Sequence, residues 1–210
     1  MKRHNVVKHF ISFLTENDVA IFSGSELCKE AYAYDRPGNF YLEDTFGLAV
    51  SFALGVALCS DKKVFVFVGE GDLLRDLSSA AQASASSCKN LILVVLDNGV
   101  YQGVSNQPNI FDRLVSKRGL FYDMGFLVQD YTKHFRDSKF KQLKNIINRL
   151  KGPVVVLIEL SAGINKKIES LFVDKIEAGS NLTEFLTRAP KDDRIDNKKP
   201  LNLDQGGGIN

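Results

Sequence analysis

The chain has 210 residues, of which 44% are hydrophobic and 25% are charged, and its formal net charge is +2. This composition is typical of a globular domain with a full core, and the small net charge argues against a nucleic-acid partner. No apolar run approaches the about 18 residues that a membrane span needs, and the cysteines and histidines lack metal-site spacing. We therefore expect a cytoplasmic protein with reduced thiols, no zinc site and no membrane contact.

Apolar runs alternate with helical patterns along the chain. The N-terminal segment predicts an amphipathic helix with a buried side, formed by Val6, Val7, Phe10, Ile11, Phe13 and Leu14. Strands are predicted at residues 19–22, 39–42, 64–68, 91–96 and 153–160, with one more at the end of residues 111–131. Helices are predicted at residues 27–33, 47–59, 73–87 and 140–151, and a helix and a turn are predicted before the strand within residues 111–131. This order predicts an α/β fold, a doubly wound parallel sheet with helices on both faces.

The domain is predicted to end near residue 187. From about Arg188 the composition becomes polar, with Pro190, Pro200 and three consecutive glycines. A segment with so few apolar residues cannot bury enough surface to fold. Residues 188–210 are therefore predicted to be a disordered tail or a binding arm, and residues 1–187 a single domain.

A Gly-acid-Gly motif stands where the strand at residues 64–68 is predicted to end. Gly69 and Gly71 flank Glu70 there, and glycine permits positive φ and a close approach of the backbone to a ligand. The following helix would point amides near Asp72 and Leu73 at the same place, which favours a phosphate. An ordinary strand–turn–helix with an acidic helix start would show the same letters, so this motif alone is weak. The pattern GxGxxG is absent, which disfavours a nicotinamide site.

A second polar pair follows the next predicted strand. Asp97 and Asn98 place a carboxylate and a carboxamide at its end, and Asn98 comes 28 residues after Glu70. If the two strands are neighbours, Glu70 and Asn98 face one crevice at the carboxyl edge of the sheet, where α/β proteins bind ligands. Mg²⁺ prefers such oxygen ligands and would complete its shell with a backbone carbonyl and phosphate oxygens.

These residues resemble the signature of thiamine-diphosphate enzymes, in which Gly-Asp-Gly is followed by an asparagine. Residues 35–58, 89–101, 106–108 and 152–160 are also similar, in the same order, to the small decarboxylases of sulfopyruvate and phosphonopyruvate. The likeness extends to the β subunit of sulfopyruvate decarboxylase in particular, and it covers about residues 19–163. It implies the thiamine-diphosphate-binding fold, in its PP-type or diphosphate-binding form.

The resemblance also implies a ligand set at this site. Glu70, Asn98 and the carbonyl of Val100 would bind Mg²⁺. Phe46 would support the bent shape of the thiamine diphosphate, and the Asp44 carbonyl would accept a hydrogen bond from its exocyclic amine. The full set of implied cofactor contacts comprises Gly24, Ser25, Asp44, Thr45, Phe46, Gly69, Glu70, Gly71, Asp72, Leu73, Asn98, Val100 and Tyr101.

The resemblance further implies that this chain is only part of an enzyme. The family's catalytic glutamate lies on a pyrimidine-binding domain, here expected on a separate subunit, so no catalytic residue is expected on this chain. The assembly would be a dimer or an α2β2 heterotetramer. The substrate would be a small 2-oxo acid with an acidic tail such as sulfonate or phosphonate, and the reaction its decarboxylation.

Three departures from the family pattern leave alternatives open. Glu70 replaces an aspartate, and Asp44 and Phe46 replace a glycine and a methionine. After Tyr101, residues 102–105 (Gln-Gly-Val-Ser) replace a stretch similar to Gly-Ser-Thr-Gly. These changes are also consistent with a non-catalytic or regulatory subunit that keeps the fold, or with a carboligating subunit similar to acetolactate synthase. A β subunit of a 2-oxo acid:ferredoxin oxidoreductase is disfavoured, because the sequence has no cysteine cluster for an iron–sulfur centre.

Overall fold

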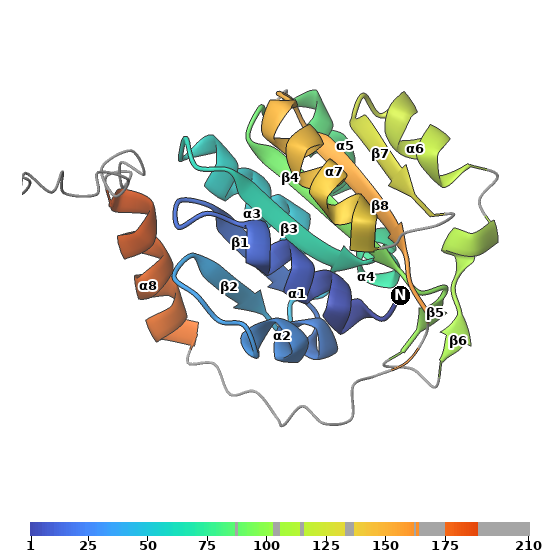
Figure 1. Ribbon diagram of the computed structural model, residues 1–210, viewed down its shortest axis with the longest axis horizontal. Coiled ribbons are helices and arrows are strands. Elements are labelled where there is room, and N and C mark those ends of the chain that lie inside the picture. Colours follow the sequence, from blue (N-terminus) through green and yellow to red (C-terminus); the bar gives the residue numbers. More distant parts are fainter. Residues whose placement is uncertain are drawn as a thin grey trace, which may run out of the picture.

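A six-stranded, wholly parallel sheet forms the centre of the protein (Figure 1). The computed structural model describes residues 1–86, 88–102, 106–113, 116–132, 137–161, 163 and 175–188. In spatial order the strands are β2 (Asn39–Leu42), β1 (Val19–Ser23), β3 (Val64–Gly69), β4 (Leu91–Asp97), β8 (Val154–Glu159) and β7 (Leu127–Tyr131). The chain winds outward from β1 to β2 and then in the opposite direction from β3, so the sheet is doubly wound, as predicted.

The central strands are buried on both faces, which explains their sequences. Every residue of β1 and β4 is buried, as are the first five residues of β3 and of β8. These strands consist largely of valine, isoleucine, leucine and phenylalanine, the residues that fit a pleated surface covered on both sides.

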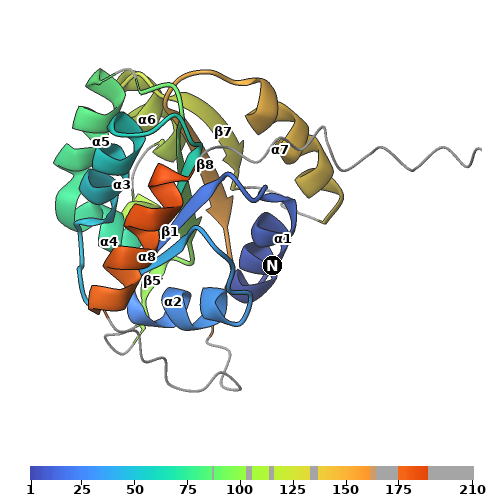
Figure 2. The same ribbon diagram turned by 90° about the vertical axis from the view of Figure 1, so that its left-hand side faces the viewer.

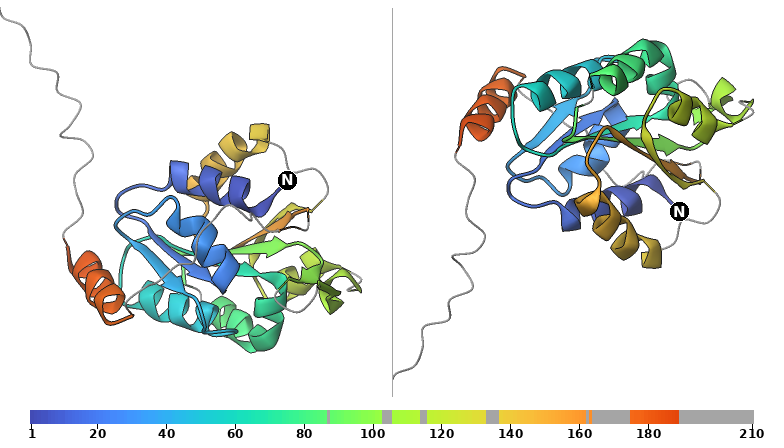
Figure 3. Two further views of the ribbon diagram at one scale, coloured as in Figure 1. Left: turned by 90° about the horizontal axis from the view of Figure 1, so that it is seen from below. Right: turned by 90° about the horizontal axis from the view of Figure 1, so that it is seen from above.

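Helices cover the two faces of the sheet in two layers (Figure 3). One apolar layer holds α1 (Arg3–Phe13), α2 (Ser25–Tyr32) and α7 (Asp137–Arg149) against the sheet. The other holds α3 (Ala49–Leu58), α5 (Leu77–Ala85) and α6 (Lys117–Asp123). The predicted amphipathic N-terminal helix is confirmed, because Val6, Val7 and Phe10 are fully buried in the first layer and Ile11, Phe13 and Leu14 pack against it.

The helix predicted at residues 73–87 is interrupted. A short helix α4 (Glu70–Leu73) and a 3₁₀ turn (Leu74–Asp76) precede α5. The interruption has a local cause, since the Asp76 side chain accepts a hydrogen bond from the Ser79 amide and caps α5. The start of α4 at Glu70 places this residue directly at the end of β3.

Four further elements were not predicted. A short antiparallel pair, β5 (Val100–Tyr101) with β6 (Gln107–Pro108), follows β4, and a 3₁₀ turn (Ile110–Arg113) comes next. Helix α8 (Lys175–Thr187) lies along the edge of the sheet beside β2 (Figure 2). Apart from Arg188, the predicted tail lies outside the described residues. Among the described helices, none combines the length and apolarity of a membrane span.

Candidate functional site

The predicted site residues meet at a cavity at the carboxyl ends of β1, β3 and β4. This cavity has a volume of about 370 Å³, which suits a small-molecule ligand. It lies where the winding of the sheet reverses, between β1 and β3. Its lining includes Gly24, Ser25, Phe46, Gly69, Glu70, Gly71, Asp72, Asn98, Val100 and Tyr101.

Three of the predicted residues lie outside this lining. Leu73 is buried in the core beneath α4 and is 2% exposed. Asp44 is exposed, and Thr45 is half-buried in the same loop. The hydroxyl of Thr45 is buried and has no hydrogen-bond partner in the described part of the chain.

The glycines of the cavity differ in backbone conformation and in surroundings. The possibility of positive φ at Gly69 and Gly71 is not used, since φ of Gly69 is −73° and Gly71 is not among the positive-φ residues. Gly24 does need glycine, with φ +93° at the start of α2. A Cβ atom at Gly24 or Gly69 would meet nothing within 4 Å, so both backbones face open space.

Gly71 is a glycine because Tyr101 lies against it. A Cβ atom at Gly71 would be 2.5 Å from Cε1 of the Tyr101 ring. The ring therefore packs directly on the backbone of α4, and the β5–β6 pair that carries Tyr101 is held against the Gly-Glu-Gly turn.

Glu70 is the buried carboxyl group of the site. It is 2% exposed, and its Oε1 accepts a hydrogen bond from Asn109 Nδ2 at 2.5 Å. Burial, and then the nearby Asp97 carboxylate, raise the pKa of Glu70 to about 7, although amides of Glu70 and Asn98 and the Asn109 side chain oppose this shift. A bound cation here would favour the ionised form.

Asp97 and Asn98 separate at the end of β4. Asp97 is buried, forms an ion pair with Lys117 and accepts a hydrogen bond from the Gly99 amide, so its carboxylate is not part of the cavity lining. Asn98 does line the cavity, and its Oδ1 accepts from the Val100 amide at 3.0 Å. The amide side chain, rather than the carboxylate next to it, is therefore the group that accompanies Glu70.

The Asp72 side chain joins three segments around the cavity. One of its oxygens accepts a hydrogen bond from the Ser23 hydroxyl at the end of β1, and the other accepts from the Gly47 amide at 2.6 Å. The sequence predicted only that the Asp72 amide contacts the cofactor. The two side-chain hydrogen bonds of Asp72 hold the loop that carries Phe46.

Two arginines and one asparagine belong to the site although the sequence pattern did not indicate them. Arg3 lines the cavity and pairs with the buried Glu30, at 2.8 Å, and with Gln102. Arg75 lines it too, with its guanidinium 4.7 Å from the centre of the Phe46 ring. Asn109 directly follows the segment at residues 106–108 that resembles the family, and no feature of the sequence marks it as part of the site.

The oxygen atoms present suit Mg²⁺ better than a softer metal. In the described part of the chain no group of three or more histidine, cysteine, aspartate or glutamate side chains could hold a metal ion. A metal at this cavity would rely on the Glu70 carboxylate, the Asn98 amide oxygen, a main-chain carbonyl and ligand oxygens, which is a hard donor set. The residues present therefore fit a magnesium ion that is shared with a phosphate group.

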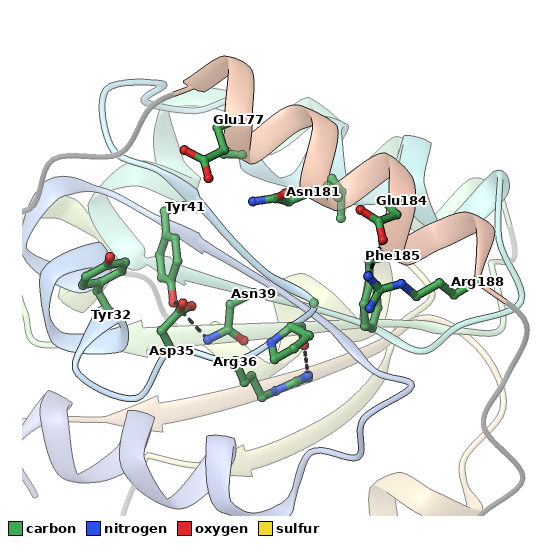
Figure 4. Close-up of a pocket in the computed structure, with 14 residues that line it drawn as sticks. Tyr32, Asp35, Arg36, Asn39, Tyr41, Glu177, Asn181, Glu184, Phe185 and Arg188 are labelled. Carbon is green, nitrogen blue, oxygen red and sulfur yellow. Dashed lines mark hydrogen bonds and ion pairs between the residues drawn. The ribbon is translucent and has the colours of Figure 1, made fainter.

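A larger cavity, of about 540 Å³, lies between α8 and the edge of β2 (Figure 4). Its wall is of mixed charge and contains Tyr41, whose hydroxyl donates to Asp35 at 2.6 Å and accepts from Asn39 at 3.0 Å. Arg188, directly after α8, is paired with Glu184 on this helix. None of the predicted site residues lines this cavity.

Comparison with known proteins decides the family. Residues 26–160 match the family model described as "Thiamine pyrophosphate enzyme, C-terminal TPP binding domain". The chain belongs to this family. The matched residues of this thiamine pyrophosphate enzyme domain include the whole cavity lining from Glu26 to Gln102, while α8 lies beyond them.

Several relatives of this domain are decarboxylases by name. The chain is 30% identical over 156 residues to the sulfopyruvate decarboxylase subunit beta of Methanocaldococcus jannaschii, which covers 74% of this chain and 82% of that protein. It is 31% identical over 105 residues to the phosphonopyruvate decarboxylase of Streptomyces viridochromogenes, covering 50% of this chain and 26% of that protein. These matches confirm the family resemblance that the sequence motifs indicated.

Solved structures confirm the fold. The benzoylformate decarboxylase of Polynucleobacter necessarius superposes with a TM-score of 0.64 at 14% identity, over 79% of this chain and 34% of that chain. A thiamine diphosphate-dependent 4-hydroxybenzoylformate decarboxylase from Rhodococcus jostii gives 0.63 at 11% identity, over 78% of this chain and 33% of that chain. This chain thus spans about a third of these enzymes, and at such identities the likeness concerns the fold alone.

Proposed function

We propose that this chain is the diphosphate-binding subunit of a thiamine-diphosphate- and Mg²⁺-dependent 2-oxo acid decarboxylase. The observation that carries the proposal is the buried Glu70 beside Asn98 in a cavity whose glycine backbones at Gly24 and Gly69 face open space. A relative of similar length, named a decarboxylase subunit beta, supports the assignment to a subunit.

The proposal gives a role to several of the residues that line the cavity. Glu70, Asn98 and the Val100 carbonyl would hold the magnesium ion, and the backbones of Gly24 and Gly69, which face open space, would admit the diphosphate. Phe46, held in place through the Asp72–Gly47 hydrogen bond, supports the cofactor from the side. When bound, thiamine diphosphate supplies the electron sink that a decarboxylation requires.

The proposal requires a second, pyrimidine-binding subunit. The cavity is open to solvent at Phe46, which is 52% exposed, and Leu48 beside it is 56% exposed. Apolar side chains exposed at the rim of a ligand site fit a surface that another protein covers. That partner would supply the catalytic glutamate, and the complex would be a dimer or an α2β2 heterotetramer.

Arg75 supports a substrate with an acidic tail. It lines the cavity, and within the described residues no carboxylate lies at ion-pair distance from its guanidinium. A guanidinium is well suited to bind a sulfonate, phosphonate or carboxylate group. We therefore assign the substrate to the class of 2-oxo acids that carry a second anionic group.

Calorimetric titration tests the proposal. Thiamine diphosphate is added to the full chain, together with any subunit that copurifies, in Mg²⁺ and in EDTA. We expect binding that requires the metal and is lost in Glu70→Ala. Glu159→Ala is the matched control, because Glu159 is an exposed carboxylate at the end of β8, on the same edge of the sheet but outside the cavity. No binding by the wild-type complex would refute the proposal.

A non-catalytic subunit is the second candidate. Glu70 and Phe46, which both line the cavity, stand where the family pattern has an aspartate and a methionine. Cofactor binding without turnover of any 2-oxo acid, in the presence of the partner subunit, would favour this candidate.

A further inference from the structure

We propose that Asn109 is a positioning residue that holds Glu70 in place and ties together the two strand ends that carry the metal ligands. The inference rests on the proposed function, since it concerns the same metal site. It adds to the site a residue that neither the sequence motif nor the family match assigns.

Asn109 makes three hydrogen bonds, and they reach three different segments. Its Nδ2 donates to Glu70 Oε1 at 2.5 Å. Its main-chain N–H donates to the Gly99 carbonyl at 3.1 Å, and its Oδ1 accepts from the Phe111 amide at 2.9 Å. One residue thus connects the turn after β3 with the turn after β4, because Glu70 follows β3 and Gly99 directly follows Asn98.

The environment makes these bonds strong. Asn109 and Glu70 are each 2% exposed, so water does not compete for the contact between them. A hydrogen bond to an ionised carboxylate in such surroundings is about twice as strong as one between neutral groups. The bond also restricts the rotation of the Glu70 side chain.

The path of the chain explains how Asn109 reaches the site. After Asn98 the chain turns at Gly99, where φ is +73°, and leaves along β5. It returns along β6, which pairs with β5 through Val100 opposite Pro108 and Tyr101 opposite Gln107. Asn109 is the next residue, so the antiparallel pair places it beside Gly99, at the turn that follows β4.

The contact with Asn109 restrains the Glu70 side chain, which is longer than the aspartate of the family pattern. Glutamate has one more rotatable bond than the aspartate of the family pattern, so its carboxylate is less defined by the backbone alone. Mg²⁺ requires near-octahedral geometry, and an unrestrained ligand lowers its affinity. Asn109 supplies the restraint that the longer side chain lacks, as hydrogen-bonded neighbours of metal ligands commonly do.

Two substitutions separate this role from a local structural one. Asn109→Ser keeps a hydroxyl that can accept from the Phe111 amide, but it is too short to reach Glu70. Asn109→Ala removes both side-chain bonds. Asn90→Ala is the control. Asn90 directly precedes β4, at the end of this strand that is remote from the metal site, and its Nδ2 donates to the carbonyls of Ala57, Ser60 and Lys62 at 2.8–3.0 Å.

The readout is the affinity for Mg²⁺ at saturating thiamine diphosphate, measured by calorimetry on the full chain with its copurifying subunit. We expect Asn109→Ser and Asn109→Ala to weaken Mg²⁺ about 10- to 100-fold. Asn90→Ala should lower the melting temperature and leave the Mg²⁺ affinity unchanged. If Asn109→Ala does not fold, the Mg²⁺ affinity of Asn109→Ser is the test. An unchanged Mg²⁺ affinity in Asn109→Ser would overturn the inference.

A double-mutant cycle with Glu70→Asp provides the sharper test. The shorter aspartate does not reach Asn109, so Asn109→Ser should weaken Mg²⁺ much less in the Glu70→Asp background than in the wild type. Equal losses in both backgrounds would show that Asn109 acts on the fold rather than through Glu70. If the wild-type complex itself shows no metal-dependent binding, the proposed function fails and this inference fails with it.

Discussion

The guanidinium of Arg75 lies over the ring of Phe46, with its central carbon 4.7 Å from the ring centre. This stack joins the 3₁₀ turn before α5 to the loop that follows β2, and both residues line the cavity. The ring holds the cation at the cavity without neutralising it, so its charge remains available to an anionic ligand.

Substitution of Arg75 should therefore alter substrate selection. We expect Arg75→Gln to raise the KM for a 2-oxo acid with a sulfonate tail about tenfold or more, and to leave the KM for pyruvate nearly unchanged, because a hydrogen bond to a charged group is lost only with the former. Steady-state kinetics of the complex measure both constants. Arg118→Gln, an exposed arginine on α6, is the control. An equal rise for both substrates would contradict a role in recognising the tail.

The two glycines of the Gly-Glu-Gly turn should respond differently to alanine. Gly69→Ala places a methyl group in open space at a φ of −73°, so the free energy of unfolding should stay the same or rise by about 0.4–1 kcal/mol. Gly71→Ala places it 2.5 Å from the Tyr101 ring and should cost about 1–3 kcal/mol.

Urea unfolding measures both effects, and calorimetry of thiamine diphosphate completes the comparison. Gly69→Ala should lose cofactor affinity in spite of its intact stability, because the methyl group occupies the space of the diphosphate. Adding Tyr101→Ala to Gly71→Ala should restore much of the lost stability. Full cofactor binding by Gly69→Ala would show that the diphosphate lies elsewhere.

The raised pKa of Glu70 predicts a pH dependence of stability in the metal-free protein. Its folded-state pKa of about 7 lies above the ordinary value of 4.5, so folding takes up a proton between these values. The free energy of unfolding should therefore fall by about 3 kcal/mol in total as the pH rises from 4.5 to 7. Above pH 7 this contribution should stay constant.

Glu70→Gln removes the ionisation and should abolish this dependence. Urea unfolding in EDTA should show the variant about 3 kcal/mol more stable than the wild type at pH 8 and nearly equal to it at pH 4.5. With thiamine diphosphate and Mg²⁺ present at pH 8, the order should reverse, since only the wild type binds the metal. The same difference at both pH values would contradict the assigned pKa.

The ion pair between Arg3 and Glu30 should contribute to stability as well. Glu30 is 2% exposed, so Arg3→Ala leaves a buried carboxylate without its partner and should cost about 3 kcal/mol or more. Removing both charges, in Arg3→Ala with Glu30→Gln, should recover part of the loss. The exposed pair of Arg188 with Glu184 is the control, and Arg188→Ala should change the free energy of unfolding by less than about 1 kcal/mol.

The sequence by itself determined the sheet, the position of the site and the family. The strand runs of β3, β4 and β8 are continuous and apolar because both of their faces are covered, and such runs are visible without a structure. Polar residues at strand ends, such as Glu70 and Asn98, are equally visible, because parallel strands place them at one edge. The sequence could therefore predict where the cavity lies.

Only the tertiary structure decided which atoms meet there. The bonds of Asn109 to Glu70, Lys117 to Asp97 and Asp72 to Ser23 join residues that are 39, 20 and 49 positions apart, and no local periodicity records them. The same holds for α8, which lies beyond the family match and packs beside β2 through Leu182 and Phe185. Local patterns follow from backbone geometry, whereas such contacts depend on the relative placement of whole elements, which the packing of the core sets.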